Sequence, residues 1–159
     1  MVSAKKKIFF SILVAVILVP VVFMSMYKIA PVAWNPWGGV NTTSGVAIQG
    51  YDAVAYHKLG QASKGDPSYA AEWNDVEWYF VSHEHRSLFE ADPESYAPQF
   101  GGYCATAVSI GLTANTDPES WHIENGKLYL FFNDDPKQDY IAQIDDGIIA
   151  RSEGNWSKR

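Results

Sequence analysis

Cys104 is the only cysteine in the 159 residues, and it follows the glycine pair Gly101-Gly102. A lone cysteine excludes an intrachain disulfide and any Cys-x-x-Cys site for zinc, an iron–sulfur cluster or thioredoxin-like redox chemistry. Three interpretations stay open: a buried apolar residue, a reactive or metal-binding thiolate, or an intermolecular disulfide. The start of an expected short helix favours the thiolate, because backbone N–H groups and the helix dipole lower the pKa of a thiol.

The histidines are the other candidate ligands. His83 and His85 form a His-Glu-His motif at the start of an expected helix, where two residues turn the side chains to nearly opposite sides. A solvated helix start is therefore expected there rather than a shared metal. His57, on an expected first strand, and His122, opening the last hairpin, could reach Cys104 through the fold. We expect Cys104 as the first metal ligand, with His57 ranked second and His122 third.

Motifs that would indicate an enzyme are missing from the sequence. It contains no Gly-x-Ser-x-Gly, no His-Glu-x-x-His, no P-loop and no Gly-x-Gly-x-x-Gly. A nucleophilic pair of Cys104 with His57 or His122 is formally available, yet no spacing singles it out. Catalysis is therefore a minor interpretation, and the expected protein is not an enzyme.

The charge distribution excludes one class of partner. The chain has 12 basic and 18 acidic residues, but four of the basic ones lie within the first 28 residues, which leaves 8 basic against 18 acidic residues, a net −10, in the remainder. Such an acidic domain does not bind nucleic acid through a basic face. Its 47% hydrophobic and 14% aromatic content predicts a packed core rather than a disordered chain.

An uncharged apolar run from Ile8 to Met26 predicts a membrane-spanning helix. Three lysines precede the run and only Lys28 follows it, so residues 1–7 are expected to form a cytoplasmic basic tail and the domain to be extracytoplasmic, periplasmic in a bacterium. The run is longer than the usual core of a cleaved secretory signal, which favours a retained signal anchor over residues 8–27. Three aromatic residues beyond the run, Tyr27, Trp34 and Trp37, suit the headgroup layer or the first residues of the folded domain.

Hydrophobic patterns and turn residues predict a small α+β domain over residues 46–152, after a linker at 28–45 and before a tail at 153–159. Its expected strands are 53–57, 69–73, 76–81, 121–124 and 127–132, the last two joined by Asn125-Gly126. The expected helices are 83–91, a short one from residue 103 that ends near Gly111, and 135–151. Three Asp-Pro pairs, at Asp92, Asp117 and Asp135, predict helix starts. The fold class is thus a small antiparallel sheet of hairpins packed by short helices, preceded by one transmembrane helix.

Several motifs that occur in one order resemble those of the YHS-domain proteins over about residues 45–135. They are Gly50-Tyr51-Asp52-Ala53-Val54-Ala55-Tyr56, Trp78-Tyr79-Phe80-Val81-Ser82, Phe89, Asp92-Pro93, Tyr96-Ala97-Pro98, Gly101-Gly102-Tyr103-Cys104, Ala107-Val108-Ser109 and Gly126-Lys127-Leu128-Tyr129-Leu130. The resemblance implies a module related to the metal-handling domains of copper-transporting ATPases, and also found in membrane-attached proteins. The two cysteines of the metal-binding type would fall near Ala55 and His85, so this chain lacks them. Cys104 in Gly-Gly-Tyr-Cys looks like the hallmark of the secreted or anchored branch.

The expected function is therefore a membrane-anchored YHS-like domain that binds a transition metal, copper ahead of zinc or haem, for metal handling or sensing. Two alternatives stay open: a non-catalytic interaction module with a membrane protein as partner and Cys104 as buried packing, and a Cys-dependent enzyme. Burial of Cys104 would distinguish the interaction module from the metal-binding domain. A thiol that titrates above about pH 8 counts against the enzyme.

Overall fold

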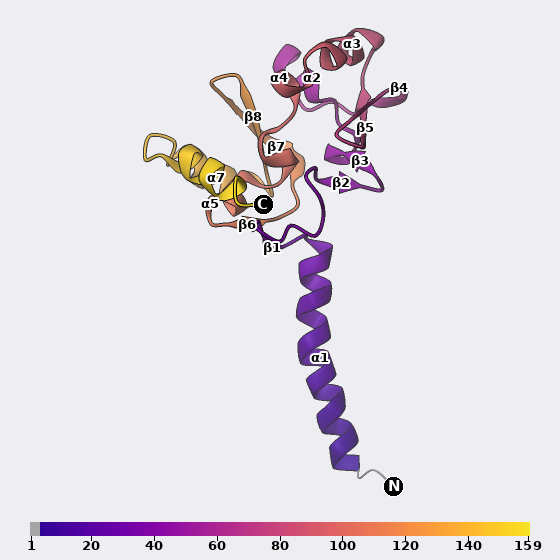
Figure 1. The fold of residues 1–159 in the computed structure, drawn as a ribbon, viewed down its shortest axis with the longest axis vertical. Helices are drawn as coiled ribbons and strands as arrows, with labels where there is room; N and C mark the ends of the chain where they lie inside the picture. The colour runs from indigo at the N-terminus through magenta and orange to yellow at the C-terminus, as the bar shows by residue number, and fades with distance from the viewer. Residues whose placement is uncertain (1–3) are drawn as a thin grey trace.

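The structure, a computed structural model, describes the backbone of residues 4–159 and the side chains of residue 14 and residues 16–159. One long helix, α1 (Ala4–Met26), projects from a body that holds all the other elements (Figure 1). The strands of the body are β1 (Ala30–Pro31), β2 (Thr42–Thr43), β3 (Val46–Ala47), β4 (Asp66–Trp73), β5 (Val76–Phe80), β6 (Leu112–Thr113), β7 (Asp117–Glu124) and β8 (Lys127–Phe131). Its helices are η1 (Ile48–Gly50), α2 (Ala53–Lys58), α3 (His83–Ala91), α4 (Pro93–Tyr96), η2 (Gln99–Gly102), α5 (Ala105–Ser109), α6 (Asp134–Ile141) and α7 (Ile148–Trp156).

The strands form three small sheets, of which the largest has the order β2-β3-β5-β4. Its pairs are antiparallel except for β3 and β5, which are parallel. The hairpins β4–β5 and β7–β8 confirm the expected ones, and their turns place Asn74, Asp75, Asn125 and Gly126 at positive φ (54°, 59°, 50° and 76°). Two successive positive φ values characterise the type I′ turn, whose twist matches that of paired strands.

Helix α3 was predicted with the bounds that it has. The Ser82 side chain accepts a hydrogen bond from the backbone N–H of His85, which caps the helix as expected. Phe89 is buried on its inner face. The expected short helix is α5, which follows Cys104 without a side-chain cap and ends just before Gly111 at φ 82°. The Asp92-Pro93 pair starts α4, with the Asp92 carboxylate accepting from Ser95 N.

Residues 53–57 form a helix, so the prediction of a first strand was wrong. The alternation of Ala53, Val54, Ala55 and Tyr56 suggested one exposed face, yet all four side chains are buried. Helix α2 is surrounded by the fold and begins at an Asp52 cap, whose Oδ1 accepts from Val54 N and Ala55 N. A short apolar run cannot distinguish a buried helix from a strand by its periodicity.

The expected long C-terminal helix is two helices, α6 and α7, separated by a turn with Gly147 at φ 78°. Both contribute to the core as predicted, since Tyr140 and Ile148 are each 1% exposed. Helix α7 continues to Trp156, four residues past the expected domain end. Asp117 begins strand β7 rather than a helix, and Asp135 lies inside α6, whose cap is Asn133. Of the three Asp-Pro pairs, only the one at Asp92 therefore starts a helix.

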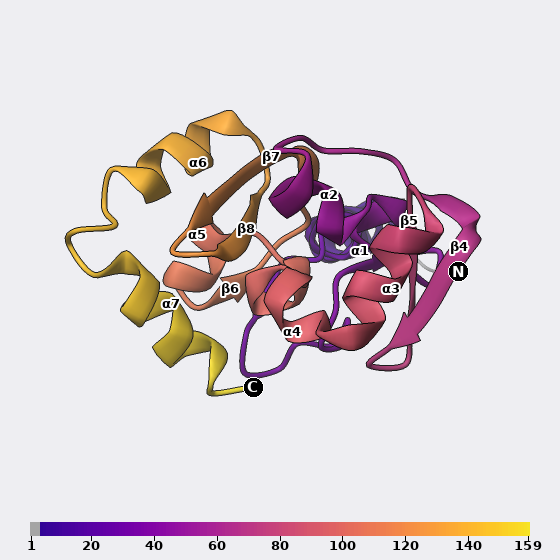
Figure 2. The same cartoon turned by 90° about the horizontal axis from the view of Figure 1, so that it is seen from above.

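Two hydrophobic cores lie side by side in the body (Figure 2). The first packs α2 and α3 against the four-stranded sheet, with Trp78, Phe80 and Phe89 at its centre. The second packs α5, α6 and α7 against the β7–β8 hairpin around Tyr129 and Tyr140. The fold class is α+β with small antiparallel and mixed sheets and short helices.

The expected anchor, residues 8–27, falls within α1 and its end, and the side chains of residues 8–13 and 15 lie outside those described. Within the described part of the chain, no helix provides an apolar stretch of the length that a bilayer crossing requires.

Candidate functional site

Cys104 lies at the junction between η2 and α5 and is only 2% exposed. Its backbone N–H donates to the Ala114 carbonyl at 3.0 Å. Burial raises the pKa of the thiol, and hydrogen bonds from the backbone of Ala107, Phe132 and Thr106 oppose that rise without cancelling it. The expected lowering by the helix N-terminus is therefore outweighed, because α5 is short and the sulfur has left water.

Cys104 is therefore expected to react slowly with thiol reagents. At pH 8, iodoacetamide should modify the native chain at least about tenfold more slowly than the urea-unfolded chain, because attack requires a local opening of the fold. The raised pKa acts in the same direction, since it lowers the thiolate fraction. Mass spectrometry of timed samples gives both rates. Rapid modification of the native chain, slowed by added copper(I), would restore Cys104 as a metal ligand.

His57 lies on α2, against the ring of Tyr96 at 5.5 Å between ring centroids. Its Nε2 is buried and has no hydrogen-bond partner among the described residues. Burial lowers the pKa of this histidine, which outweighs a hydrogen bond to the Tyr96 backbone. The surroundings of the ring therefore favour its neutral form.

This lowered pKa predicts that acid destabilises the fold through His57. Below the unfolded value of 6.5, the unfolded chain binds a proton that the folded chain does not, so stability falls as the pH falls from 6.5 toward the lowered folded pKa. His57→Gln should flatten the stability profile below pH 6.5. His83→Gln, at an exposed histidine, is the control and should keep the wild-type slope. Urea unfolding at several pH values measures both, and equal slopes in wild type and His57→Gln would refute the assignment.

His122 lies on β7, and its Nε2 is 3.2 Å from Glu124 Oε2. The three expected ligands thus come from the η2–α5 junction, from α2 and from β7, and each has neighbours of its own. Among the residues with described side chains, no group of three or more His, Cys, Asp and Glu residues could hold a metal ion. Binding of copper, zinc or haem at Cys104 stays a prediction.

A buried Asp52–His85 pair was missed from the sequence. His85 Nδ1 lies 2.6 Å from Asp52 Oδ2, and the same oxygen accepts from the backbone N–H of Val81 at 2.9 Å. Asp52 is 0% exposed and His85 8%, so the expected solvated helix start was wrong for His85, although His83 is exposed as expected. The carboxylate joins the first turn of α2 to the start of α3. The signal that could have found it is the Asp that precedes Ala53, an N-cap residue type.

A cleft of about 530 Å³ in the described surface is lined by tryptophans. Trp37 reaches it from the segment after β1, Trp73 from the end of β4, and Trp156 from the end of α7, and each ring is partly buried. The buried Trp78 closes the inner wall. Three segments far apart in the sequence thus bring indole rings to one place. We therefore take this tryptophan-lined cleft as the candidate functional site.

Polar groups complete the cleft. The indole Nε1 of Trp37 is buried with no hydrogen-bond partner among the described residues. The Arg159 guanidinium lies 4.4 Å from the centroid of the Trp156 ring, within the range of a cation–π contact. A second, shallower depression continues past Trp73 and Trp156 toward Glu94, so the two together form an extended groove.

Close packing of two chain segments forms the floor of the cleft. Gly101 has φ 61°, and a Cβ added there would stand 1.9 Å from the Gly39 carbonyl oxygen. Asn41 N donates to the Gly101 carbonyl at 2.8 Å and holds the two segments together. The pair Gly101-Gly102 was expected to matter for Cys104, which follows it. In the structure, Gly101 lacks a side chain where the backbone of Gly39, close to Trp37, packs against it.

Trp37 therefore belongs to the folded domain, which was one of the two expectations for it. Trp34 is 79% exposed, and Tyr27 packs against Phe132 at 5.8 Å between ring centroids.

Comparisons of the chain with protein-family models, with curated proteins and with solved structures found no match.

Proposed function

We propose that this chain is a non-catalytic, YHS-like interaction module, held at a membrane by residues 8–27, whose tryptophan-lined cleft binds an extended, proline-containing segment of a partner protein. The cleft carries the proposal. Pockets that bind ligands are concave and mostly apolar, with a few placed polar groups, and the groups at Trp37 and Arg159 match that description.

An extended proline-containing peptide suits the geometry of the groove. Such segments adopt a polyproline II helix whose carbonyl groups are free to accept hydrogen bonds, and they dock in grooves lined by aromatic rings. The rings of Trp37, Trp73 and Trp156 supply apolar faces for proline rings. The Trp37 N–H has no hydrogen-bond partner among the residues that the structure describes, so a small rotation that offers it to a peptide carbonyl would satisfy this donor.

The state of Cys104 supports an interaction module over the two other candidates. A metal ligand or a nucleophile acts as the thiolate, whereas burial raises the pKa of this thiol. The thiol is also covered, at 2% exposed. Both properties are those of a small packing residue.

Anchoring at the membrane is part of the proposal and rests on the uncharged run from Ile8 to Met26. The lysines before that run orient the N-terminus to the cytoplasm and the domain to the extracytoplasmic side, the periplasm in a bacterium. The partner is then a protein with an extended segment on that side, most simply another membrane protein.

The experiment is a selection of proline-containing ten-residue peptides from a displayed library on the full chain in lipid nanodiscs. The affinities of selected peptides are then measured for Trp156→Ala, for Trp37→Phe and for the control Trp34→Ala. Trp156→Ala should weaken binding about thirtyfold, since a central tryptophan of an interface contributes about 2 kcal/mol or more. Trp37→Phe keeps a ring and removes only the N–H donor, so its effect should be smaller.

Trp34→Ala is a matched control because it removes a tryptophan that is 79% exposed and outside the cleft. It should bind the selected peptides as the wild type does. The proposal fails if no peptide is selected above an empty nanodisc, or if the selected peptides bind Trp156→Ala as tightly as the wild type. Circular dichroism of each variant shows that the fold is retained.

A further inference from the structure

The end of α1 is tied to the body by several hydrogen bonds. Asn115 donates from its backbone N–H to the Tyr27 carbonyl at 2.8 Å and from its side chain to the Met26 carbonyl at 3.1 Å. Thr113 Oγ1 donates to the Lys28 carbonyl at 2.7 Å, and β1 then pairs with β6. The body therefore has a fixed orientation relative to α1 rather than hanging on a flexible linker.

Large apolar side chains are exposed on the face of the body that surrounds the end of α1. Trp34 is 79% exposed, Ile110 72% and Phe132 42%. Trp34 lies just after β1 and Ile110 just before β6, the strand that pairs with β1, while the Phe132 ring contacts Tyr27. We call these three residues the apolar underside.

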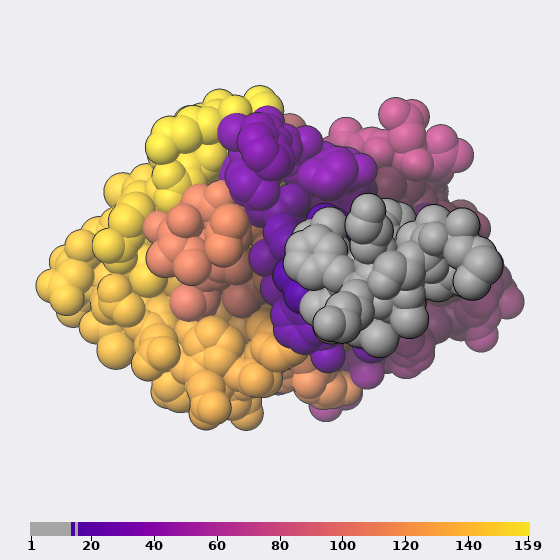
Figure 3. All heavy atoms as spheres, turned by 90° about the horizontal axis from the view of Figure 1, so that it is seen from below, coloured from indigo at the N-terminus to yellow at the C-terminus, as the bar shows by residue number. Residues whose placement is uncertain are grey.

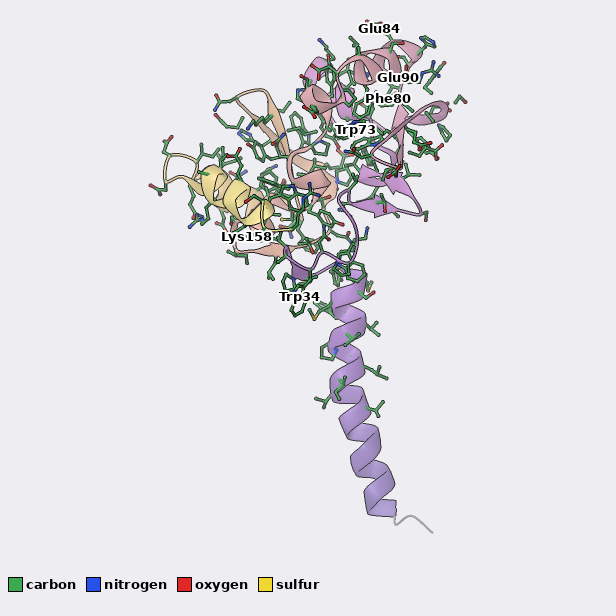
Figure 4. The ribbon with its side chains drawn as sticks, in the orientation of Figure 1. Trp34, Trp73, Phe80, Glu84, Glu90 and Lys158 are labelled. Atoms are coloured by element: carbon green, nitrogen blue, oxygen red, sulfur yellow. The ribbon has the colours of Figure 1, made fainter. Side chains whose placement is uncertain are left out.

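The figures place this surface next to α1. In the view from below, violet residues of the N-terminal third and salmon residues of the α5–β6 region are neighbours on one face (Figure 3). Trp34 lies beside the end of α1, on the side of the body that faces along the helix (Figure 4). Helices α2, α3 and α4 lie at the opposite end of the body (Figure 1).

We propose that the apolar underside rests in the headgroup layer of the bilayer that α1 enters, so that the body docks on the membrane in one orientation. The inference deepens the proposed anchoring and rests on it. Tryptophan favours the interface between water and hydrocarbon, and isoleucine and phenylalanine gain by leaving water. A bilayer is the occupant because the fixed attachment of α1 carries this face toward any membrane that the helix enters.

Charge on the body favours a zwitterionic rather than an anionic lipid surface. Beyond residue 28 the chain has 8 basic and 18 acidic residues, so anionic lipids repel it. Lys28, the first cation after the apolar run, turns into the body, where its Nζ donates to Asn41 Oδ1 at 3.0 Å. The underside therefore docks by apolar and aromatic contact.

The experiment places an environment-sensitive dye on single added cysteines of the full chain in phosphatidylcholine nanodiscs. The variants are Ile110→Cys on the underside and Leu59→Cys at the end of α2, an exposed apolar position (52%) near the opposite end of the body. The wild type, whose only cysteine is buried, gives the background of labelling. Dye at position 110 should emit to the blue of dye at position 59 and lose intensity when headgroups carry a spin label.

The outcomes separate the two proposals. Incorporation into nanodiscs with the same emission and the same quenching at positions 110 and 59 would overturn the docking and leave the anchoring in place. A full chain that does not enter nanodiscs would overturn the anchoring, and the docking with it. Stronger quenching at position 110 than at position 59 in these phosphatidylcholine nanodiscs, which contain no anionic lipid, supports docking by apolar contact.

Discussion

Asp52→Ala is expected to lower the free energy of unfolding by about 3–5 kcal/mol, because it removes a buried carboxylate to which several neighbouring groups are hydrogen-bonded. The carboxylate is fully buried and accepts from Val54 N, Ala55 N and Val81 N at 2.8, 3.1 and 2.9 Å. It also holds His85 Nδ1 at 2.6 Å. Alanine leaves Val54 N, Val81 N and His85 Nδ1 without this acceptor in a largely buried region, while Ala55 N keeps its hydrogen bond to the backbone carbonyl of residue 52. The loss therefore exceeds that of an ordinary helix cap.

Equilibrium urea unfolding of the full chain in detergent, followed by near-ultraviolet circular dichroism, measures the effect. Asp92→Ala is the matched control, because Asp92 caps α4 in the same way but is exposed. It should lower the free energy of unfolding by about 1 kcal/mol. Equal losses in the two variants would mean that Asp52 acts only as a cap and does not join α2 to α3.

Local sequence signals predicted the elements that depend on neighbouring residues. Asn125-Gly126 and Asn74-Asp75 determine their own turn conformations. Ser82 caps α3 by accepting a hydrogen bond from His85, only three residues further along the chain. These elements appear where the sequence places them. Residues 53–57 could not be assigned in this way, because a short run of small apolar residues fits a buried helix and a buried strand equally well.

The candidate site could not be predicted for a related reason. Trp37, Trp73 and Trp156 meet only because three distant segments converge, and no local pattern reports that convergence. The same limit applies to Cys104, whose helix-start position is local, while the burial that raises its pKa depends on the packing of the whole fold around it. Asp52 and His85 are 33 residues apart, so their pairing also lay beyond a local argument.

Gly101→Ala is expected to be among the most damaging single substitutions in the body. Gly101 has φ 61°, and an alanine Cβ would stand 1.9 Å from the Gly39 oxygen, 2.9 Å from the Gly39 carbonyl carbon and 3.2 Å from Val40 Cα. These neighbours are backbone atoms, so the whole segment 38–40 must move. The left-handed conformation costs about 1–2 kcal/mol for alanine, and the overlap adds about 1–3 kcal/mol or more.

Gly126→Ala isolates the contribution of the close contact. Gly126 has φ 76° but nothing within 4 Å of an added Cβ, so this variant carries the conformational cost without the overlap. Urea unfolding of both variants should show a larger loss for Gly101→Ala, and its cleft should also lose affinity for the selected proline-containing peptides, because segment 38–40 carries the chain next to Trp37. Gly126→Ala should bind those peptides as the wild type does. Equal stability of the two variants would show that the segments can separate at Gly101 without loss, and the cleft would then not depend on their close approach.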